Sequence, residues 1–400
     1  NHCIQHYIMK KIYLKKGKEE SLLRFHPWIF SGAINHMDEQ PEEGEVVEVY
    51  TNQNTYIATG HFQIGSIMVR VLSFDKETID TEFYRHKLSV ALNVRKSIGV
   101  ADNPQNNTYR LVHGEGDNLP GLVIDIYGKT AVMQAHSVGM HCDRKIIAES
   151  LKQVMGETIT SIFYKSETTL PFKAELEQEN GFLYGDNTDN IAMENGLLFH
   201  VDWLKGQKTG FFVDQRDNRS LLEHYSSNRN VLNMFCYTGG FSFYAMRGGA
   251  NIVHSVDSSQ KAIDLTNANV NLNFPNDSRH KAFAEDAFKF LDNMQETYDL
   301  IILDPPAFAK HKDALHNALK GYSRLNQKAF EKIAPGGILF TFSCSQVVTK
   351  DKFRTAVFTA AAMAKRKVRI LHQLHQPADH PINMYHPEGE YLKGLVLYVE

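Results

Sequence analysis

The chain has 400 residues, of which 42% are hydrophobic and 22% charged, and its formal net charge is -3 at pH 7. This length predicts about two to four domains, and the composition is that of a soluble protein with sizeable cores. No apolar run approaches the ~20 residues of a membrane span. Any contact with nucleic acid has to come from local patches, because the net charge is close to neutral.

The cysteines lie at positions 3, 142, 236 and 344 and show neither CxxC nor CxxH spacing. We therefore expect no structural zinc, no disulfide framework and no metal site. The opening stretch NHCIQHYI lacks the charged segment and apolar core of a secretory signal, and Met9 is a candidate for the natural start. These features predict a cytoplasmic protein.

Residues 10–78 are typical of a small β-rich module. The stretch KKIYLKKGK surrounds three apolar residues with lysines, and EGEVVEVY, TYIATGHF and SIMVRVLSF have the pattern of strands separated by turns. Lysines beside a strand can follow a phosphate backbone, but a run of charge also forms a solvated edge. Both interpretations stay open at this point.

Residues 79–185 form a second predicted unit. TEFYRHKLSVALNVRKSIG has helical periodicity, RLVHGEGDNLPGLVIDIYGKTAVMQAH predicts a pair of hairpins, and HCDRKIIAESLKQVMG predicts another helix. Glu115 and Asp117 in the loop GEGDNLPG suggest a metal or acid/base site as one alternative. Turn formation is the favoured interpretation.

The stretch from Val231 to Pro306 organises the rest of the chain. Short apolar runs alternate there with helical segments, which predicts a parallel α/β sheet. Asp257, Asp286 and Asp304 each follow a strand, so their side chains should converge beyond the carboxyl ends of the strands. The later runs ILFTFSCS, VRILHQL and LKGLVLYVE add strands, and the last two should be antiparallel neighbours because no helix separates them. This pattern predicts seven strands with one reversed.

The turn after the first strand of this sheet indicates the cofactor. Gly239 and Gly240 allow a tight turn, but neither G-x-G-x-x-G nor G-x-x-x-x-G-K-[ST] is present. A turn without a phosphate-binding lysine, followed by acids for a ribose and an adenine edge, fits S-adenosylmethionine. Asp257 is expected to bind the ribose hydroxyls and Asp286 the adenine amino group, although each could instead cap a helix.

The motifs YTGGFS, DPPAFAK, KTGFFVDQRDNR and SCS resemble those of the three-domain large-subunit ribosomal RNA cytosine-5 methyltransferases. The resemblance covers about Met9 to Glu400. It implies a PUA domain at 9–78 that binds RNA and a central α+β domain at 79–185 that lies between the other two domains and has a positioning role. It also implies a class I Rossmann-like methyltransferase domain with a seven-stranded mixed sheet at 186–400. The implied cofactor is S-adenosylmethionine and the implied partner is ribosomal RNA, while a homodimer is left open.

The resemblance also implies the residues that bind the cofactor. The segment before the core sheet folds over the methionine end in this family; without the resemblance, Phe211 and Phe212 would be assigned to the core. The expected set is Lys208, Thr209, Phe211, Asp214, Gln215, Arg216, Phe235, Tyr237, Thr238, Gly239, Asp257, Ser258, Asp286, Ala287, Asp304 and Pro305.

Carbon-5 of cytosine is a poor nucleophile, so an enzyme first adds a thiolate to carbon-6 of the base. Cys344, at the end of the fifth predicted strand beside Asp304, matches the family's nucleophile; Asp304 would hydrogen-bond the ring nitrogen of an extruded base. Cys344 could also be a small buried hydrophobe. Cys236 is assigned to packing near the cofactor. Other RNA cytosine-5 methyltransferases carry a second cysteine after the aspartate-proline pair, which this chain lacks, so the base for the carbon-5 proton is unidentified.

Two other functions stay open. Methyltransferases that modify exocyclic nitrogens carry an acid-Pro-Pro-aromatic loop, but Ala307 stands at the aromatic position here and Phe308 follows it. A methyltransferase for a guanine or adenine nitrogen is therefore weakened as an alternative. A non-catalytic RNA-binding or ribosome-assembly factor would not need Asp257, Asp286, Asp304 and Cys344 together. The sequence leaves open which nucleotide is modified. It also leaves open whether the substrate is naked RNA or an assembling ribosomal particle.

Overall fold

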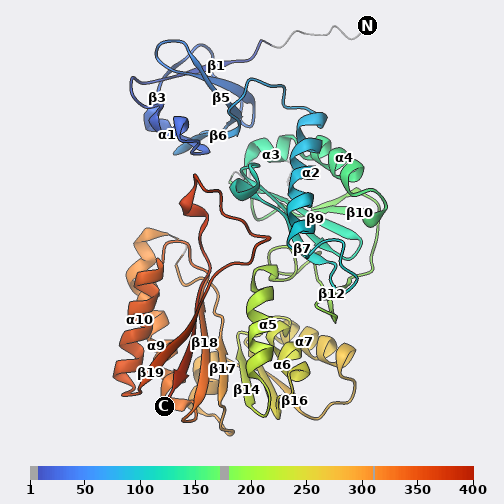
Figure 1. The fold of residues 1–400 in the computed structure, drawn as a ribbon, viewed down its shortest axis with the longest axis vertical. Helices are drawn as coiled ribbons and strands as arrows, with labels where there is room; N and C mark the ends of the chain where they lie inside the picture. The colour runs from blue at the N-terminus through green and yellow to red at the C-terminus, as the bar shows by residue number, and fades with distance from the viewer. Residues whose placement is uncertain (1–7, 172–179, 310) are drawn as a thin grey trace. The chain divides into compact units, whose positions relative to one another are not determined.

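The computed structural model describes residues 8–171, 180–309 and 311–400 and is drawn as a ribbon in Figure 1. The chain forms two compact units. Unit 1 comprises the described residues of 1–190 with 201–211 and 378–389, and unit 2 comprises 191–200, 212–377 and 390–400. This division is coarser than the three predicted domains, whose boundaries stay predictions. It groups 201–211 and 378–389, which lie in the predicted methyltransferase domain, with unit 1.

The first sheet of unit 1 lies in the N-terminal module. Its strand order is β2-β6-β5-β4-β1-β3, and β1 is parallel to β4 but antiparallel to β3. Alternating residues such as Ile12, Leu14, Val47 and Val49 form its core, because successive side chains of a strand point to opposite faces. The strands are β1 (Lys11–Leu14), β2 (Trp28–Phe30), β3 (Ile34–Met37), β4 (Val46–Tyr50), β5 (Tyr56–Phe62) and β6 (Ile67–Ser73), and a short helix α1 spans Glu20–Leu23.

A second sheet of unit 1 has the order β11-β10-β9-β8-β7. Helix α2 begins at the N-cap Asp80, whose carboxylate accepts a hydrogen bond from the Phe83 N–H at 3.0 Å. Its apolar face joins helix α4 in covering the sheet core. The elements are α2 (Thr81–Ser97), β7 (Thr108–His113), β8 (Leu122–Tyr127), β9 (Thr130–Ala135), α3 (Val138–Cys142), α4 (Arg144–Met155), β10 (Ser161–Tyr164) and β11 (Gly181–Tyr184).

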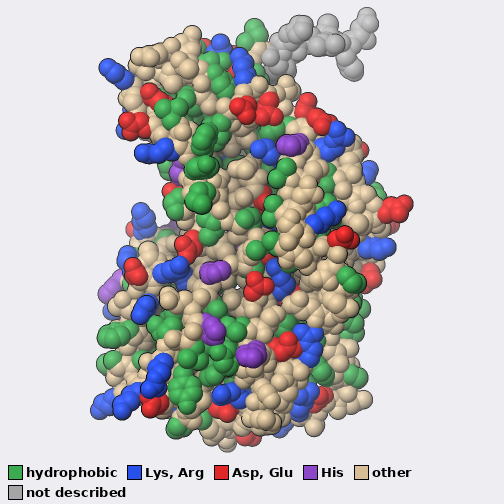
Figure 2. All heavy atoms as spheres, in the orientation of Figure 1, with side chains coloured by type: hydrophobic (Ala, Val, Ile, Leu, Met, Phe, Trp, Pro, Cys, Tyr) green, Lys and Arg blue, Asp and Glu red, His purple; other side chains and the backbone are tan. Residues whose placement is uncertain are grey.

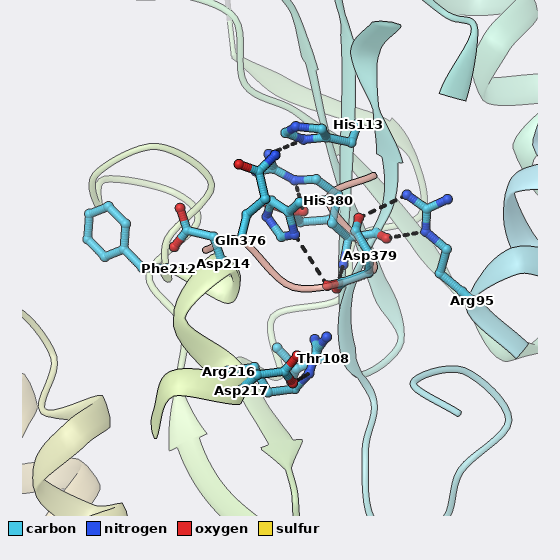
Figure 3. A network of polar contacts seen from close by, with 12 residues as sticks. Arg95, Thr108, His113, Phe212, Asp214, Arg216, Asp217, Gln376, Asp379 and His380 are labelled. Atoms are coloured by element: carbon cyan, nitrogen blue, oxygen red, sulfur yellow. Dashed lines mark hydrogen bonds and ion pairs between the residues drawn. The ribbon is translucent and has the colours of Figure 1, made fainter. Parts of the chain in front are cut away.

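A buried arginine explains the loop GEGDNLPG. Arg95 is 0% exposed and donates to both carboxylate oxygens of Asp117, at 2.5 and 2.7 Å. It also donates to the carbonyl oxygen of Asp379 at 2.9 Å (Figure 3). Glu115 accepts from the N–H of Gly121 at 3.1 Å. Both acids are used in local structure, which supports turn formation over an acid/base site, and Asp379 brings segment 378–389 against unit 1.

The main sheet of unit 2 has the order β16-β15-β14-β17-β18-β20-β19. Strand β20 is antiparallel to both β18 and β19, and the remaining neighbours are parallel. The predicted seven-stranded sheet with one reversed strand is therefore confirmed. Its strands are β14 (Asn230–Met234), β15 (Ile252–Asp257), β16 (His280–Ala284), β17 (Leu300–Leu303), β18 (Gly337–Ser343), β19 (Val368–Leu374) and β20 (Lys393–Val399).

Helices cover both faces of this sheet, which explains why its central strands are almost wholly apolar. Alternate residues such as Leu300 and Ile302 pack with α5, α6 and α7, whereas Ile301 and Leu303 pack with α8, α9 and α10. The helices are α5 (Arg216–Tyr225), α6 (Gly240–Arg247), α7 (Gln260–Asn273), α8 (Ala287–Asp292), α9 (Leu315–Lys332) and α10 (Lys350–Met363), and a small hairpin joins β12 (Ile191–Glu194) to β13 (Leu197–His200).

Candidate active site

The turn between β14 and α6 has an unusual backbone. Phe235, Tyr237 and Gly239 have φ angles of 60°, 49° and 88°, a region that non-glycine residues occupy only where the surroundings hold them there. Helix α7 supplies part of that support, because the hydroxyl of Thr266 donates to the Tyr237 carbonyl at 2.9 Å and Asn269 donates to the Thr238 carbonyl at 2.8 Å. The turn is therefore fixed by its neighbours.

Gly239 and Thr238 make this turn a fit for a ligand. A Cβ on Gly239 would stand 2.8 Å from Cγ2 of Thr266, so only glycine allows the backbone to lie this close to the Thr266 side chain. The Thr238 hydroxyl is buried, in a residue that is 2% exposed, and has no hydrogen-bond partner among the described residues. A buried hydroxyl without a partner is costly. The residues of the turn therefore fit a bound polar cofactor that would satisfy Thr238.

The predicted ribose acid lies beside this turn. Asp257 ends β15, the neighbour of β14, and its carboxylate accepts hydrogen bonds from the Tyr237 N–H at 3.1 Å and the Ser259 N–H at 3.0 Å. Ser258 follows on the surface. Each carboxylate oxygen has two lone pairs, so these contacts orient Asp257 and leave acceptor capacity for ribose hydroxyls.

Asp286 fulfils the alternative role that the sequence left open. It is the N-cap of α8 and accepts from the Lys289 N–H at 3.1 Å. Its exposed side chain follows the edge strand β16, and Ala287 behind it is buried. Because capping uses one oxygen, binding of an adenine amino group stays a prediction for Asp286.

Cys236 behaves as a packing residue in this geometry. Its thiol is buried, and burial raises its pKa to about 12. The sulfur lies 3.6 Å from the hydroxyl oxygen of Thr266. A thiol with this pKa is protonated at neutral pH and is a poor nucleophile, which supports the predicted structural role.

The loops that follow β17 and β18 are tied to each other. These strands are parallel neighbours, and Asp304 and Cys344 lie just beyond their carboxyl ends, both partly exposed. The hydroxyl of Ser345 donates to the carbonyl of Ala309, and the rings of Phe308 and Tyr322 lie 4.7 Å apart. The structure therefore joins the DPPAFA and SCS motifs at one edge of the sheet.

Tyr322 of α9 stands at this junction. Ser343 donates a hydrogen bond to its hydroxyl oxygen at 2.8 Å. Burial, together with negative charge on Cys344 and Asp304, raises the pKa of Tyr322 to about 12. Tyr322 is thus a neutral hydroxyl within electrostatic range of both predicted catalytic groups.

The segment 208–216 is divided between the units. In unit 1, Thr209 donates to the carboxylate of Asp125 at 2.6 Å and lies 2.6 Å from the hydroxyl of Tyr127. Lys208 is exposed and Phe211 buried. The hydroxyl of Thr209 is therefore used within unit 1, and cofactor binding by these three residues stays a prediction.

The rest of that segment belongs to unit 2, where Asp214, Gln215 and Arg216 are buried. Asp214 accepts a hydrogen bond from the hydroxyl of Tyr391 at 2.7 Å, and Gln215 accepts from the side-chain amide of Asn218 at 2.7 Å. Arg216 lies 3.8 Å from the carboxylate of Asp217 at the start of α5. These contacts hold the predicted residues in place without showing what they bind.

One group of possible metal ligands lies in unit 1. His26, His386 and Glu388 bring ligand atoms within 4.8 Å of one another. The Nδ1 atom of His26 accepts from the Trp28 N–H at 3.2 Å, so a neutral ring carries its proton on Nε2, which lies 3.1 Å from Glu388. A direct hydrogen bond from His26 to Glu388 accounts for that contact without a cation.

The lysines of the N-terminal module differ in their surroundings. Lys10 pairs with Glu45 at 3.1 Å and Lys11 lies over the ring of Tyr50, whereas the lysines of the following turn are exposed. Figure 2 shows positive and negative side chains interspersed on the face that it presents. No described helix combines the length and hydrophobicity needed to span a bilayer.

The seven-stranded sheet and the turn of residues 235–240 define a class I methyltransferase domain. A family model described as S-adenosylmethionine-dependent methyltransferase matches residues 173–384, and a PUA-like domain model matches residues 12–74. The chain is 42% identical over 394 residues to ribosomal RNA large subunit methyltransferase I of Aeromonas hydrophila, covering 96% of this chain and 98% of the relative. It is 41% identical to the protein of the same name from Tolumonas auensis, with the same coverage.

The chain therefore belongs to the ribosomal RNA large subunit methyltransferase I family. It is an S-adenosylmethionine-dependent methyltransferase with a PUA-like domain, as its motifs predicted. Two solved structures share the fold: a protein described as a SAM-dependent methyltransferase from Streptococcus mutans (TM-score 0.83, 23% identity) and a methyltransferase complexed with SAH (TM-score 0.84, 24% identity). Each covers 98% of this chain and 100% of the solved one.

Sequence reasoning did not single out Tyr322, Tyr391 or Lys393. The two tyrosines come from segments that sequence spacing does not connect to the site. Lys393 had a weak signal, because it is a charged residue at the start of an otherwise apolar strand.

Proposed function

We propose that this chain methylates carbon-5 of a cytosine in large-subunit ribosomal RNA through a covalent adduct with Cys344. The observation that carries the proposal is the junction of the DPPAFA and SCS loops, where Tyr322 lies within electrostatic range of both Asp304 and Cys344. A thiol and a carboxyl group that follow neighbouring parallel strands match the two requirements of carbon-5 chemistry: a nucleophile for carbon-6 and a group that binds the ring nitrogen.

The substrate class rests on the relatives and on the N-terminal module. Relatives that match this chain from end to end are named ribosomal RNA large subunit methyltransferase I. A PUA-like domain at residues 12–74 provides a second module that can hold RNA, although the net charge of the chain is only -3. The cytoplasm is the location where such an enzyme would meet its RNA.

The residues of the site perform distinct steps. The Cys344 thiolate forms a bond from sulfur to carbon-6, and the electron pair of the carbon-5 to carbon-6 double bond shifts so that carbon-5 becomes nucleophilic. A hydrogen bond between the Asp304 carboxyl group and the ring nitrogen stabilises the charge that develops there. After carbon-5 has gained its methyl group, water or another side chain accepts its proton, the electron pair of that C–H bond re-forms the double bond between carbon-5 and carbon-6, and the bond from sulfur to carbon-6 breaks to restore the thiolate.

S-adenosylmethionine supplies an electrophilic methyl group when bound. Asp257 would hold the ribose, Asp286 the adenine amino group, and Thr238 would gain a partner for its buried hydroxyl. Phe235, Tyr237 and Gly239 provide the strained turn that approaches the cofactor, and Pro305 stiffens the loop behind Asp304. A base within a duplex would have to be extruded to reach Cys344 and Asp304, at a cost that is lower for a loop or single strand.

Phe308 argues against methylation of an exocyclic nitrogen. In an acid-Pro-Pro-aromatic loop the aromatic ring stacks on the target base. Here the ring of Phe308 packs against Tyr322 and the apolar core under α9. This arrangement favours carbon-5 as the target.

The test is transfer of a labelled methyl group to unmodified ribosomal RNA, with nucleoside analysis of the product, for the wild type, Cys344→Ala and the control Cys142→Ala. Cys142 is an exposed cysteine of unit 1. We expect labelled 5-methylcytosine with the wild type and the control, and a loss of at least ~10³-fold with Cys344→Ala, as for other covalent catalysts. A methylated purine, or an active Cys344→Ala variant, would overturn the proposal.

A further inference from the structure

Lys393 is a buried lysine next to the predicted nucleophile. It is the first residue of β20 and pairs in antiparallel register with Ser343, the residue before Cys344. It is 5% exposed, and its Nζ atom donates to the carbonyl oxygen of Ser345 at 2.6 Å. Its backbone therefore pairs with the residue before Cys344, and its side chain contacts the residue after it.

No carboxylate of the described residues forms an ion pair with the Lys393 ammonium group. Glu390, the acid closest in sequence, pairs with Lys350 at 2.7 Å. Burial, partly offset by negative charge on Cys344 and Glu390, lowers the pKa of Lys393 to about 8. A buried ammonium group is costly unless it is paired with an anion.

Cys344 can supply that anion. An ordinary cysteine has a pKa of about 8.5, and a neighbouring lysine lowers it. The other groups that act at this junction are Tyr322, which is neutral because burial raises its pKa to about 12, and the Asp304 carboxyl group. A negative charge on Asp304 would oppose a thiolate, so a cation is needed to favour it.

We infer that Lys393 is a positioning residue that holds Cys344 as a thiolate, an inference that rests on the proposed function of Cys344. In this step the S–H bond of Cys344 breaks, sulfur keeps the electron pair, the proton passes to water, and the positive charge of the Lys393 ammonium group stabilises the thiolate. The hydrogen bond to Ser345 fixes the ammonium group to the same loop. The pair then attacks carbon-6 through sulfur, while Lys393 does not touch the base.

The test is the pH dependence of Cys344 alkylation by iodoacetamide in the free enzyme, followed by peptide mass spectrometry. Lys393→Met removes the charge and keeps an apolar stem of similar length, and Lys393→Arg keeps the charge. We expect the alkylation midpoint of Cys344 to rise by about one pH unit in Lys393→Met, with about tenfold slower reaction at pH 7 and an equal rate at high pH. Lys393→Arg should stay close to the wild type. Equal midpoints in the wild type and Lys393→Met would overturn the inference.

Two further measurements separate this inference from its alternatives. Binding of S-adenosylhomocysteine, which involves no contact with Lys393 in the proposed site, should be unchanged in Lys393→Met and shows that the variant is folded. Methyl transfer by Lys393→Met should fall about tenfold at pH 7 in kcat, with unchanged KM for RNA, and recover as the pH rises. A loss that does not depend on pH would indicate a structural role only. If only the proposed function is wrong, the Cys344→Ala enzyme stays active while Lys393→Met still raises the alkylation midpoint of Cys344.

Discussion

The hydroxyl of Ser343 donates a hydrogen bond to the hydroxyl oxygen of Tyr322 at 2.8 Å, which fixes the end of β18 to helix α9. Cys344 is the next residue along the chain, so this contact sets where its sulfur can lie. Phe308 of the DPPAFA loop packs against the ring of the same tyrosine.

Replacing Tyr322 by Phe should reduce activity more than stability. The variant loses one buried hydrogen bond, worth about 1 kcal/mol in unfolding free energy, and releases the Cys344 loop. We expect methyl transfer to fall about tenfold at a similar melting temperature. Tyr298→Phe is the matched control, because Tyr298 is also buried and contacts His254 at 2.6 Å before β17 begins. Equal activity losses in both variants would show that Tyr322 has no special role at the site.

Gly239→Ala should prevent formation of the cofactor turn. Its φ of 88° and the 2.8 Å approach to Thr266 both oppose a side chain. Gly249 has a similar φ of 90°, but an added Cβ there would lie no closer than 3.8 Å to its neighbours. Gly249→Ala should therefore show only the backbone penalty, about 1–2 kcal/mol in unfolding free energy. We expect Gly239→Ala to be less stable than Gly249→Ala and to lose affinity for S-adenosylhomocysteine in calorimetry; equal behaviour of the two would contradict the proposed cofactor turn.

Asp257→Ala should weaken cofactor binding strongly. A hydrogen bond to a charged group is worth about 1.5–3 kcal/mol, which corresponds to about a 10–150-fold higher Kd for S-adenosylhomocysteine. Asp264→Ala serves as the control, because Asp264 is an exposed acid on the following helix and its carboxylate accepts a hydrogen bond from Gln260 at 2.8 Å. Unchanged affinity in Asp257→Ala would remove this residue from the site.

Asp286→Ser separates the two roles of Asp286. Serine is as good an N-cap as aspartate, so the unfolding free energy should change by less than about 0.5 kcal/mol. The shorter side chain cannot reach an adenine amino group in the same way, and we expect about tenfold weaker cofactor binding. If both stability and binding are preserved, capping is the whole function of Asp286.

Cys236 should stay unreactive where Cys344 reacts. Its pKa of about 12 keeps it protonated near neutral pH, so iodoacetamide should not modify it at pH 8 on the timescale that modifies Cys344. Cys236→Ala should retain methyl transfer within about threefold, at a stability cost of about 1 kcal/mol for the lost packing. Rapid alkylation of Cys236, or an inactive alanine variant, would show that its role extends beyond packing.

Much of unit 2 could be predicted from the sequence because the pattern of its strands is local. Runs such as YDLIILD are apolar since they are buried on both faces, and the acids after three of the strands mark the edge where ligands bind. The reversed β20 followed from the missing helix between the last two strands. The turn at Gly239 could be placed for the same reason, because its chemistry depends on adjacent residues.

The partners of these residues could not be predicted, because they come from distant segments. Tyr322 reaches Ser343 from a helix whose pattern does not show which residue faces the site. Thr209 was expected to bind the cofactor, but its hydroxyl contacts Asp125, which lies 84 residues earlier in the chain. The pairing of Lys393 with the Cys344 loop depends on the strand order of the finished sheet.

The most direct measurement of the central claim is covalent trapping with ribosomal RNA in which cytidine is replaced by 5-fluorocytidine. Fluorine at carbon-5 cannot leave as a proton does, so the bond from sulfur to carbon-6 should persist. With S-adenosylmethionine present, we predict a complex of enzyme and RNA that survives denaturation and maps to Cys344, with none for Cys344→Ala and an undiminished amount for Cys142→Ala. An adduct on another residue, or no adduct while unmodified RNA is methylated normally, would contradict the account.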